Sequence, residues 1–347
     1  AELRDPAMRG TQELFANTES VWEVDWSQDG DRLVVGTMTA KADSEYDAKN
    51  LIIWKREDGQ WKLQTRTAAP KNIEATEWSP DNTRVVIAHG DGWSIHDGQT
   101  LKIIHQADSP AASTITWNPA GGAIACGTGG GDIVILNDET YETEHQIQAH
   151  FAKIMRLQWS PDNQFLASAG GDGAVKIWNT NDWSLRETFV GHSGIVTDVS
   201  WRPDSQALAS TGYDGIVNIW SIADGTESYL SPAPKSFAWT DDNLIRSLSG
   251  RATVVDRHPV SGNVVRTIRL PDGDSDWSLQ SSRLVSRVSE HDGKQQIEVL
   301  TIDPKNHLSE FKLDSESSSD KPIMDLSHDL RSLAIQFQPR NGNAINL

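Results

Sequence analysis

The stretch MRLQWSPDNQFLASAGGDGAVKIW, residues 155–178, returns 42 residues later as TDVSWRPDSQALASTGYDGIVNIW, residues 197–220. In each copy an alternating run ends at a Trp and a Pro-Asp turn follows. An apolar run then leads through an Asp-Gly hairpin into a third run that ends at a second Trp. Alternation predicts short half-buried strands, and Asp-Gly supplies the positive φ of a tight hairpin. The stretch therefore predicts a repeated unit of antiparallel strands.

The repeat extends over the chain when the first Trp of each copy is used as its marker. The markers are Trp26, Trp78, Trp117, Trp159, Trp201, Trp239 and Trp277. A period of about 40 residues with short strands is typical of propeller blades, which bury their faces by stacking on their neighbours. We predict an all-β fold, a closed β-propeller of four-stranded antiparallel blades, with eight blades preferred and seven as the alternative.

The last repeat is degraded, and the two ends of the chain are expected to complete it. Leu326 stands where the aromatic is expected, Leu333–Phe337 gives a second strand and Ala344–Leu347 a third. The segment Thr11–Ala16 is predicted to add the missing strand, which closes the ring and protects its edges. Residues 1–10 are interpreted as a tail or a cloning remnant, and residues 11–347 as a single propeller domain.

The composition argues against several classes of partner. The chain has 49 acidic and 31 basic residues, a formal charge of -18, so its field repels phosphate backbones. No apolar stretch approaches the roughly 18 residues of a spanning helix. Cys126 is the only cysteine, which excludes an intrachain disulfide and fits a reducing compartment. We expect an acidic, soluble, cytoplasmic protein that neither binds nucleic acid nor inserts into membranes.

The fourth and fifth repeats share a set of polar residues besides their strands. The set is His150, Ser168, Asp172 and Trp178 in the fourth repeat, and His192, Ser210, Asp214 and Trp220 in the fifth. On these residues the chain resembles the WD-repeat (tryptophan-aspartate repeat) family. The resemblance implies that each set forms a buried hydrogen-bond network that holds its blade together, because a buried Asp must find donors. It also implies a protein-interaction role.

The same residue types would suit a serine hydrolase, so the two interpretations must be weighed. Both His and Asp recur at a fixed 42-residue offset, from His150 to His192 and from Asp172 to Asp214. A catalytic site is normally present once, whereas a framework feature repeats. We therefore predict no catalytic residue, and the scattered His residues and single Cys predict neither a metal site nor a cofactor.

The resemblance to the WD-repeat family also implies where partners dock, which in that family is most often the rim that carries the blade-to-blade loops and the hairpins between second and third strands. The residue four before each marker Trp is expected at the mouth of the channel, and neighbouring aromatic and basic residues are expected beside it. The predicted partner-binding residues are Trp22, Tyr46, Glu74, Lys153, Met155, Arg156, Thr197, Tyr213 and Lys235. Exposed Trp and Tyr are favoured as interface anchors.

Two alternatives stay open at this point. The polar insertion of residues 38–50 is either a partner-contacting loop or a tolerated insertion. The chain itself is either a non-catalytic scaffold or sensor domain for other proteins and peptide segments, alone or within a larger protein or complex, or a propeller enzyme or small-ligand binder that uses the channel. Glu74 with Lys235 is the one ionisable pair that we can name for the second alternative.

Overall fold

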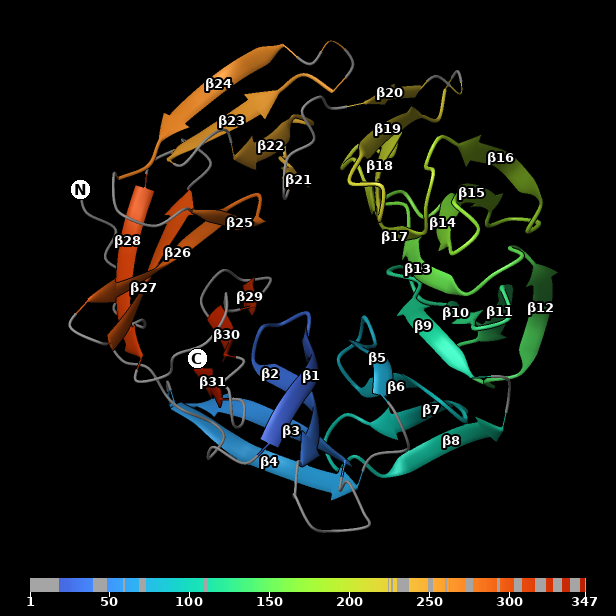
Figure 1. Cartoon of the computed structure of the whole chain (residues 1–347). Coiled ribbons are helices and arrows are strands. Elements are labelled where there is room, and N and C mark those ends of the chain that lie inside the picture. Colours follow the sequence, from blue (N-terminus) through green and yellow to red (C-terminus); the bar gives the residue numbers. More distant parts are fainter. Residues whose placement is uncertain are drawn as a thin grey trace. The chain divides into compact units, whose positions relative to one another are not determined.

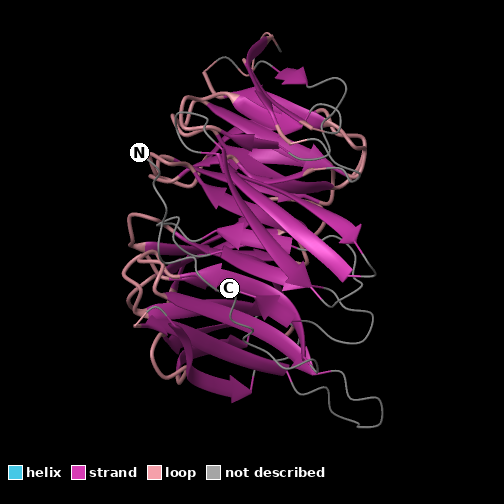
Figure 2. Cartoon of the chain, turned by 90° about the vertical axis from the view of Figure 1, so that its left-hand side faces the viewer, coloured by secondary structure: helices cyan, strands magenta, loops and turns pink. Residues whose placement is uncertain are grey.

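The structure is a computed structural model. It describes residues 19–39, 49–58, 60–68, 73–108, 111–223, 225, 227–229, 237–248, 252–259, 261, 263–271, 277–291, 294–302, 308–315, 323–326, 333–337 and 344–346. Across these residues every regular element is a β-strand, as Figure 1 and Figure 2 show. The chain divides into two compact units, residues 1–117 with 315–347 and residues 118–314.

The strands form antiparallel sheets that follow the order of the chain. Blade one contains β1 (Glu19–Trp26), β2 (Arg32–Thr39), β3 (Lys49–Glu57) and β4 (Gln60–Ala68). Blade two contains β5 (Ile73–Trp78), β6 (Arg84–His89), β7 (Gly92–Asp97) and β8 (Ile103–Asp108). Blade three contains β9 (Ala112–Trp117), β10 (Ala123–Thr128), β11 (Asp132–Asn137) and β12 (Thr143–Gln148).

The remaining blades repeat this order. Blade four contains β13 (Ile154–Trp159), β14 (Phe165–Gly170), β15 (Ala174–Asn179) and β16 (Leu185–Val190). Blade five contains β17 (Val196–Trp201), β18 (Ala207–Gly212), β19 (Val217–Ser221) and β20 (Glu227–Tyr229). Blade six contains β21 (Phe237–Trp239), β22 (Ile245–Leu248), β23 (Thr253–Arg257) and β24 (Val264–Arg269). Blade seven contains β25 (Ser278–Ser281), β26 (Leu284–His291), β27 (Lys294–Ile302) and β28 (Leu308–Ser315).

The predicted fold class is confirmed: the protein is a β-propeller of four-stranded antiparallel blades. Seven of the described sheets have four strands, and seven is the blade number that the sequence analysis gave as the alternative to eight. The degraded last repeat is a three-stranded sheet of β29 (Ile323–Leu326), β30 (Leu333–Phe337) and β31 (Ala344–Asn346). Thr11–Ala16, the predicted fourth strand, lies outside the described residues, and the single-domain boundary stays a prediction.

The turn after the marker Trp has a side-chain reason. In blade four the Ser160 hydroxyl donates to the Asp162 carboxylate at 2.6 Å and accepts from the Phe165 amide at 2.9 Å. Asn163 completes the turn at φ 59°, a conformation that Asn tolerates better than most residues. Ser27, Ser79 and Thr240 make the same bond to the Asp two residues later. This chemistry explains why Ser/Thr-x-Asp follows the marker Trp so often.

The marker Trp residues connect one blade to the one before it. The Trp201 indole donates to the Gln158 carbonyl at 3.0 Å, and the Trp201 backbone amide donates to the Gln158 side chain at 2.9 Å. Trp78 makes the same two bonds to Asp25, at 3.1 and 2.7 Å. The Trp239 indole likewise donates to the Ser200 carbonyl at 3.0 Å. At these three markers the residue before one marker Trp accepts from the marker Trp of the next blade, which adds polar ties to the apolar stacking.

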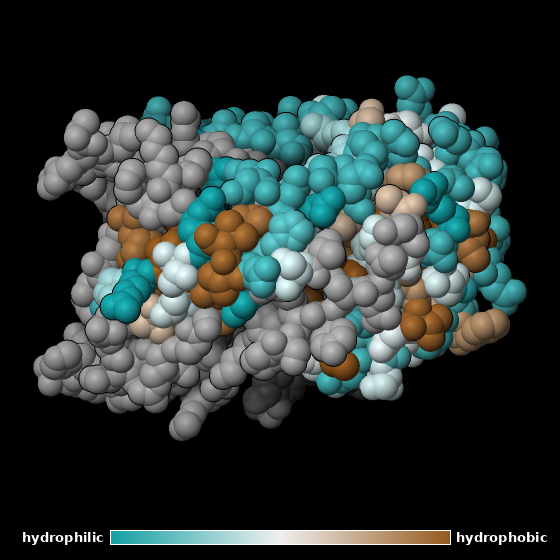
Figure 3. All heavy atoms as spheres, turned by 90° about the horizontal axis from the view of Figure 1, so that it is seen from above, coloured by the Kyte–Doolittle hydropathy of each residue, from teal (hydrophilic) through white to brown (hydrophobic). Residues whose placement is uncertain are grey.

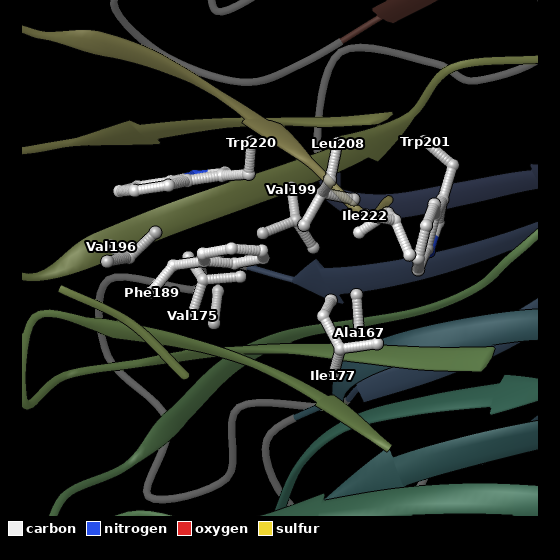
Figure 4. Packing of buried hydrophobic residues seen from close by; sticks show 11 residues of the cluster. Ala167, Val175, Ile177, Phe189, Val196, Val199, Trp201, Leu208, Trp220 and Ile222 are labelled. Atoms are coloured by element: carbon white, nitrogen blue, oxygen red, sulfur yellow. The ribbon is translucent and has the colours of Figure 1, made fainter. Parts of the chain in front are cut away.

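Apolar packing between blades four and five is shown in Figure 4. Ala167 and Ile177 of blade four face Val199 and Trp201 of blade five, and all four side chains are buried. Phe189 stacks on the Trp220 ring with centroids 4.8 Å apart. Large aromatic side chains bury 150–250 Å² each as a rough range, so these contacts account for much of the stability of the pair.

Candidate partner-binding rim

The four predicted framework residues of blade four meet in one network. His150 Nδ1 donates to the Asp172 carboxylate at 2.9 Å, and His150 Nε2 lies 2.8 Å from the Ser168 hydroxyl. Ser168 accepts from the Trp178 indole at 3.1 Å and so donates its own proton to Nε2. Burial lowers the pKa of His150, against the opposing effect of Asp172, so the imidazole is neutral at pH 7.

Blade five repeats the network with nearly the same distances. His192 Nδ1 lies 3.0 Å from Asp214, His192 Nε2 lies 2.7 Å from Ser210, and the Trp220 indole donates to Ser210 at 2.8 Å. The Ser168 and Ser210 side chains are fully buried and already bonded on both sides. Both hydroxyls are therefore closed to solvent, unlike the accessible nucleophile that a hydrolytic triad needs.

Each network also fixes a loop of the rim. The Asp172 carboxylate accepts from the amides of Phe151 and Ala174, at 3.1 and 3.2 Å, so one side chain holds both the blade-to-blade loop and the hairpin. The Gly171 amide donates to the Lys153 carbonyl at 2.8 Å. A Cβ at Gly170 would lie 2.2 Å from His150 Nδ1, so only glycine fits beside the ring. The rim is thus positioned by buried polar groups.

Four of the predicted channel-mouth residues share a local backbone feature. The pairing of the first and second strands shifts by one residue at Trp22, Glu74, Met155 and Thr197. Each of them is the extra residue of a β-bulge, which re-aims a side chain and increases local twist. Glu74 is exposed, whereas Met155 and Thr197 are half-buried. For Trp22 the structure describes the backbone position in β1.

Basic and aromatic residues of the prediction occupy the exposed surface of this rim. Lys153 is exposed, and the Tyr213 side chain, in the hairpin between β18 and β19, is 75% exposed. Arg156 lies 3.5 Å from the Asp198 carboxylate of the next blade. Partial desolvation raises the pKa of Asp198 although 62% of its side chain is exposed, and Arg156 opposes this rise. Tyr46 and Lys235 lie outside the described residues, as does most of the 38–50 insertion, so the Glu74 and Lys235 pair stays a prediction.

Sequence reasoning missed Phe151, which is 91% exposed. The signal was present, since Phe151 directly follows the network residue His150 and is fixed by Asp172. Asp198 was also missed; it stands one residue beyond the bulge at Thr197. Elsewhere, on the face shown in Figure 3, hydrophobic surface occurs as separate patches between hydrophilic residues.

Two searches over the described part of the chain gave negative results. Among those residues no group of three or more His, Cys, Asp or Glu side chains is placed to hold a metal ion. The same residues contain no helix with the length and apolar character needed to cross a membrane.

Comparisons with known proteins agree with the repeat. Residues 13–182 match the family model of the eukaryotic translation initiation factor eIF2A, and residues 183–221 match the WD domain, G-beta repeat. None of the curated proteins matches the chain.

Solved structures show the same fold at low identity. Sqt1 of Saccharomyces cerevisiae aligns with a TM-score of 0.69 and 12% identity, covering 96% of this chain and 97% of that one. A chain of the mitotic checkpoint complex aligns with a TM-score of 0.56 and 18% identity, covering 97% of this chain and 94% of that one. At these identities the likeness concerns the fold alone.

Proposed function

We propose that this β-propeller, whose residues 183–221 match the WD-domain repeat, is a non-catalytic protein-interaction scaffold or sensor domain. It binds segments of partner proteins on the rim of blades four and five and at the mouth of the channel. It works in the cytoplasm, alone or within a larger protein or complex, and it neither binds nucleic acid nor inserts into membranes.

The observation that carries the proposal is a pair of exposed aromatic side chains on a rigid rim. Phe151 is 91% and Tyr213 is 75% exposed, yet the backbone of each is tied down. The Phe151 amide donates to Asp172, and the Tyr213 amide donates to the Ile195 carbonyl at 2.9 Å. Aromatic side chains held in place lose little entropy on binding, which suits them as anchors for a partner.

The comparisons support an interaction role without specifying the partner. One structural neighbour belongs to a mitotic checkpoint complex, an assembly of proteins, and the first half of the chain resembles a translation initiation factor. The channel alternative, an enzyme or small-ligand binder, depended on Glu74 with Lys235. Lys235 lies outside the described residues, so no observation favours that alternative.

The test is affinity capture with the intact chain and with a rim variant. We expect the combined changes Trp22→Ala, Lys153→Ala, Tyr213→Ala and Lys235→Ala to remove the main captured proteins. A matched control is Val265→Ala, which alters an apolar side chain that is 56% exposed on β24. Capture of the same proteins by both variants would falsify the rim proposal, and a ligand that raises the melting temperature by binding the channel would favour the alternative.

A further inference from the structure

We infer that the propeller has a built-in point of opening, the seam between blades five and six, where a seam is the face between two consecutive blades. In a repeat fold each unit contacts only its neighbours, so stability is a sum over units and seams, and the seam with the weakest contacts separates first. Blades four, five and six lie within one compact unit, residues 118–314, so their seams can be compared directly.

Polar bonds from several parts of the blade hold the seam between blades four and five. The Trp201 indole donates to the Gln158 carbonyl at 3.0 Å, and the Trp201 amide donates to the Gln158 side chain at 2.9 Å. In the turns after the marker Trp, the Asp162 amide donates to the Ser205 hydroxyl at 3.1 Å. Blades four and five are therefore joined both in the sheet and at the turns.

The seam between blades five and six has fewer such bonds. The outer strand of blade four reaches blade five through Arg186, which donates to the Ile222 carbonyl at 3.2 Å. Between the described residues of blades five and six there is a single polar bond, from the Trp239 indole to the Ser200 carbonyl at 3.0 Å. The bonds from the marker amide, the turn and the outer strand have no counterpart among these residues.

The sequence of the turn explains why one of these bonds is missing. Between blades one and two, the Gln28 amide donates to Asn82 Oδ1 at 2.6 Å. The same turn positions of blades five and six hold Pro203 and Asn243, and proline has no N–H to donate. Asn243 Oδ1 is buried and has no hydrogen-bond partner among the described residues. Opening the seam lets water reach this carbonyl, which favours the open state.

Apolar packing differs in the same direction. The seam between blades four and five buries three aromatic side chains, Phe189, Trp201 and Trp220, in one cluster with side chains of both blades (Figure 4). In the cluster between blades five and six, Trp239 is the one buried aromatic side chain that the structure describes, and Phe237 packs beside it half-buried. Aromatic side chains bury the largest areas, so the second seam loses less hydrophobic stabilisation when it opens.

The seam between blades three and four shows that a missing turn bond is not sufficient for opening. Pro119 and Asn163 occupy the same two turn positions there, and Asn163 Oδ1 is also buried without a partner in the described part of the chain. This seam nevertheless buries Trp159 and Trp178 in one cluster, and Trp183 contacts the Trp159 ring edge-on with centroids 5.8 Å apart. Aromatic packing therefore compensates for the turn.

The seam between blades six and seven is held by charged groups. Arg246 donates to the Ser282 carbonyl, and Arg283 donates to the Asp241 carboxylate. Hydrogen bonds from charged donors are stronger than neutral ones. Within residues 118–314, as far as the structure describes them, the seam between blades five and six is thus the one that combines a single neutral bond with little aromatic packing.

Opening at this seam reaches the surface at which we propose that partners bind. Ala209 of β18 and Val217 of β19 belong to the cluster that packs on Trp239. The hairpin between the same two strands carries the exposed Tyr213. Separation of blades five and six therefore removes support from one side of this hairpin. This link rests on the proposed function, whereas the opening itself does not.

The experiment compares two indole protons by hydrogen–deuterium exchange in the full chain with isotope-labelled tryptophan. Trp201 and Trp239 are a matched pair, because each indole donates across one seam at 3.0 Å and both side chains are buried. We expect the Trp239 indole to exchange about tenfold or more faster than the Trp201 indole, because its seam opens without global unfolding. Trp201→Phe and Trp239→Phe assign the two signals. Equal rates, or faster exchange at Trp201, would overturn the inference.

A repaired turn tests the cause of the opening. Pro203 is exposed, and Pro203→Gln supplies the N–H that Gln28 donates between blades one and two. We expect this change to slow exchange of the Trp239 indole by about threefold or more and to leave the Trp201 rate unchanged. The matched control, Pro119→Gln, repairs the turn between blades three and four and should not alter the Trp239 rate.

The urea midpoint of Pro203→Gln shows whether the repaired chain is folded, and it should equal or exceed that of the unchanged chain. A Trp239 rate that responds equally to both proline changes, or to neither, would contradict the inference. Exchange of indole protons is measured without a partner, so the inference and the proposed function can fail separately.

Discussion

Blades four and six pair their strands in the same way but fill one interior position with opposite chemistry. The marker Trp pairs with Leu166 in blade four and with Ile245 in blade six. The next residue of the second strand pairs with a residue of the third strand. In blade four this pair is Ala167 with Ile177, and in blade six it is Arg246 with Asp256. One blade thus buries two apolar side chains where the other buries an ion pair.

The ion pair of blade six is well satisfied. Arg246 donates to both oxygens of Asp256, at 2.7 and 2.8 Å, and Arg266 donates to Asp256 at 3.0 Å. A third nitrogen of Arg246 donates to the Ser282 carbonyl of blade seven. Asp256 is 1% and Arg246 4% exposed. In the network around His150 the carboxylate of Asp172 stays 15% exposed and accepts from the His and two backbone amides, whereas the buried cluster of blade six is stable only while each charge keeps its partner.

The largest effect is expected from Asp256→Ala in blade six. The change leaves the Arg246 guanidinium buried without its carboxylate, and a broken buried pair costs about 3–5 kcal/mol. The matched change in blade four, Asp172→Ala, removes an acceptor from a neutral His and two amides and should cost about 1–3 kcal/mol. Urea unfolding of the two variants and the unchanged chain measures the difference.

A double change separates loss of charge balance from loss of contacts. Arg246→Met together with Asp256→Leu removes both charges and should recover most of the stability that Asp256→Ala loses, because a buried pair can often be replaced by apolar residues. Equal costs for Asp256→Ala and Asp172→Ala would show that the two blades do not differ in this way.

Much of blade four could be predicted from the sequence, and blade six could not. His150, Ser168, Asp172 and Trp178 form a set whose spacing repeats, and both copies of the set are placed as that spacing suggests. In blade six the charged residue Arg246 interrupts the apolar second strand, so alternation gives a weak signal. A partner ten residues away cannot be recognised from periodicity, since charge pairing depends on register and not on period.

Sequence-based prediction has the same limit at the rim. The sequence predicts which residues stand four before each marker Trp, and these are the bulge residues at Glu74, Met155 and Thr197. It does not show that the marker Trp itself donates to the preceding blade, as Trp201 does to Gln158. Bonds between blades join residues about 40 positions apart, and no local pattern records them.

The second prediction concerns acid, which should act on the buried histidines of blades two and four. Burial lowers the pKa values of His96 and His150 from the ordinary 6.5. The folded chain then binds fewer protons than the unfolded chain between the lowered pKa and 6.5. The two neutral histidines therefore contribute fully to the free energy of unfolding above pH 6.5, and this contribution is lost as the pH falls below 6.5. The pKa of Asp172 is also lowered, through His150 and backbone amides that outweigh its burial, so its contribution declines only below pH 3.8.

We therefore expect the urea midpoint of unfolding to decrease as the pH is lowered from 7.5 to 5. The double variant His96→Asn and His150→Gln should have a lower midpoint at pH 7.5 and a flatter response over that range. Asp256→Ala is the useful comparison, because this change should lower the urea midpoint at both pH 7.5 and pH 5. A midpoint of the unchanged chain that is constant from pH 7.5 to pH 5 would contradict the assignment of neutral buried imidazoles.

The smallest effect is expected at the other Arg–Asp pair, between blades four and five. Arg156 and Asp198 lie 3.5 Å apart with 54% and 62% of their side chains exposed, whereas Arg246 and Asp256 lie 2.7 Å apart and are buried. Water screens the exposed pair and solvates whichever partner remains, so Arg156→Ala should cost about 0–1 kcal/mol. The same Arg-to-Ala change at Arg246 leaves a buried carboxylate and should cost several times more. Urea midpoints at low and high salt separate the two cases, because salt should weaken only the exposed pair. Equal losses at both positions would mean that burial does not decide what an ion pair contributes in this protein.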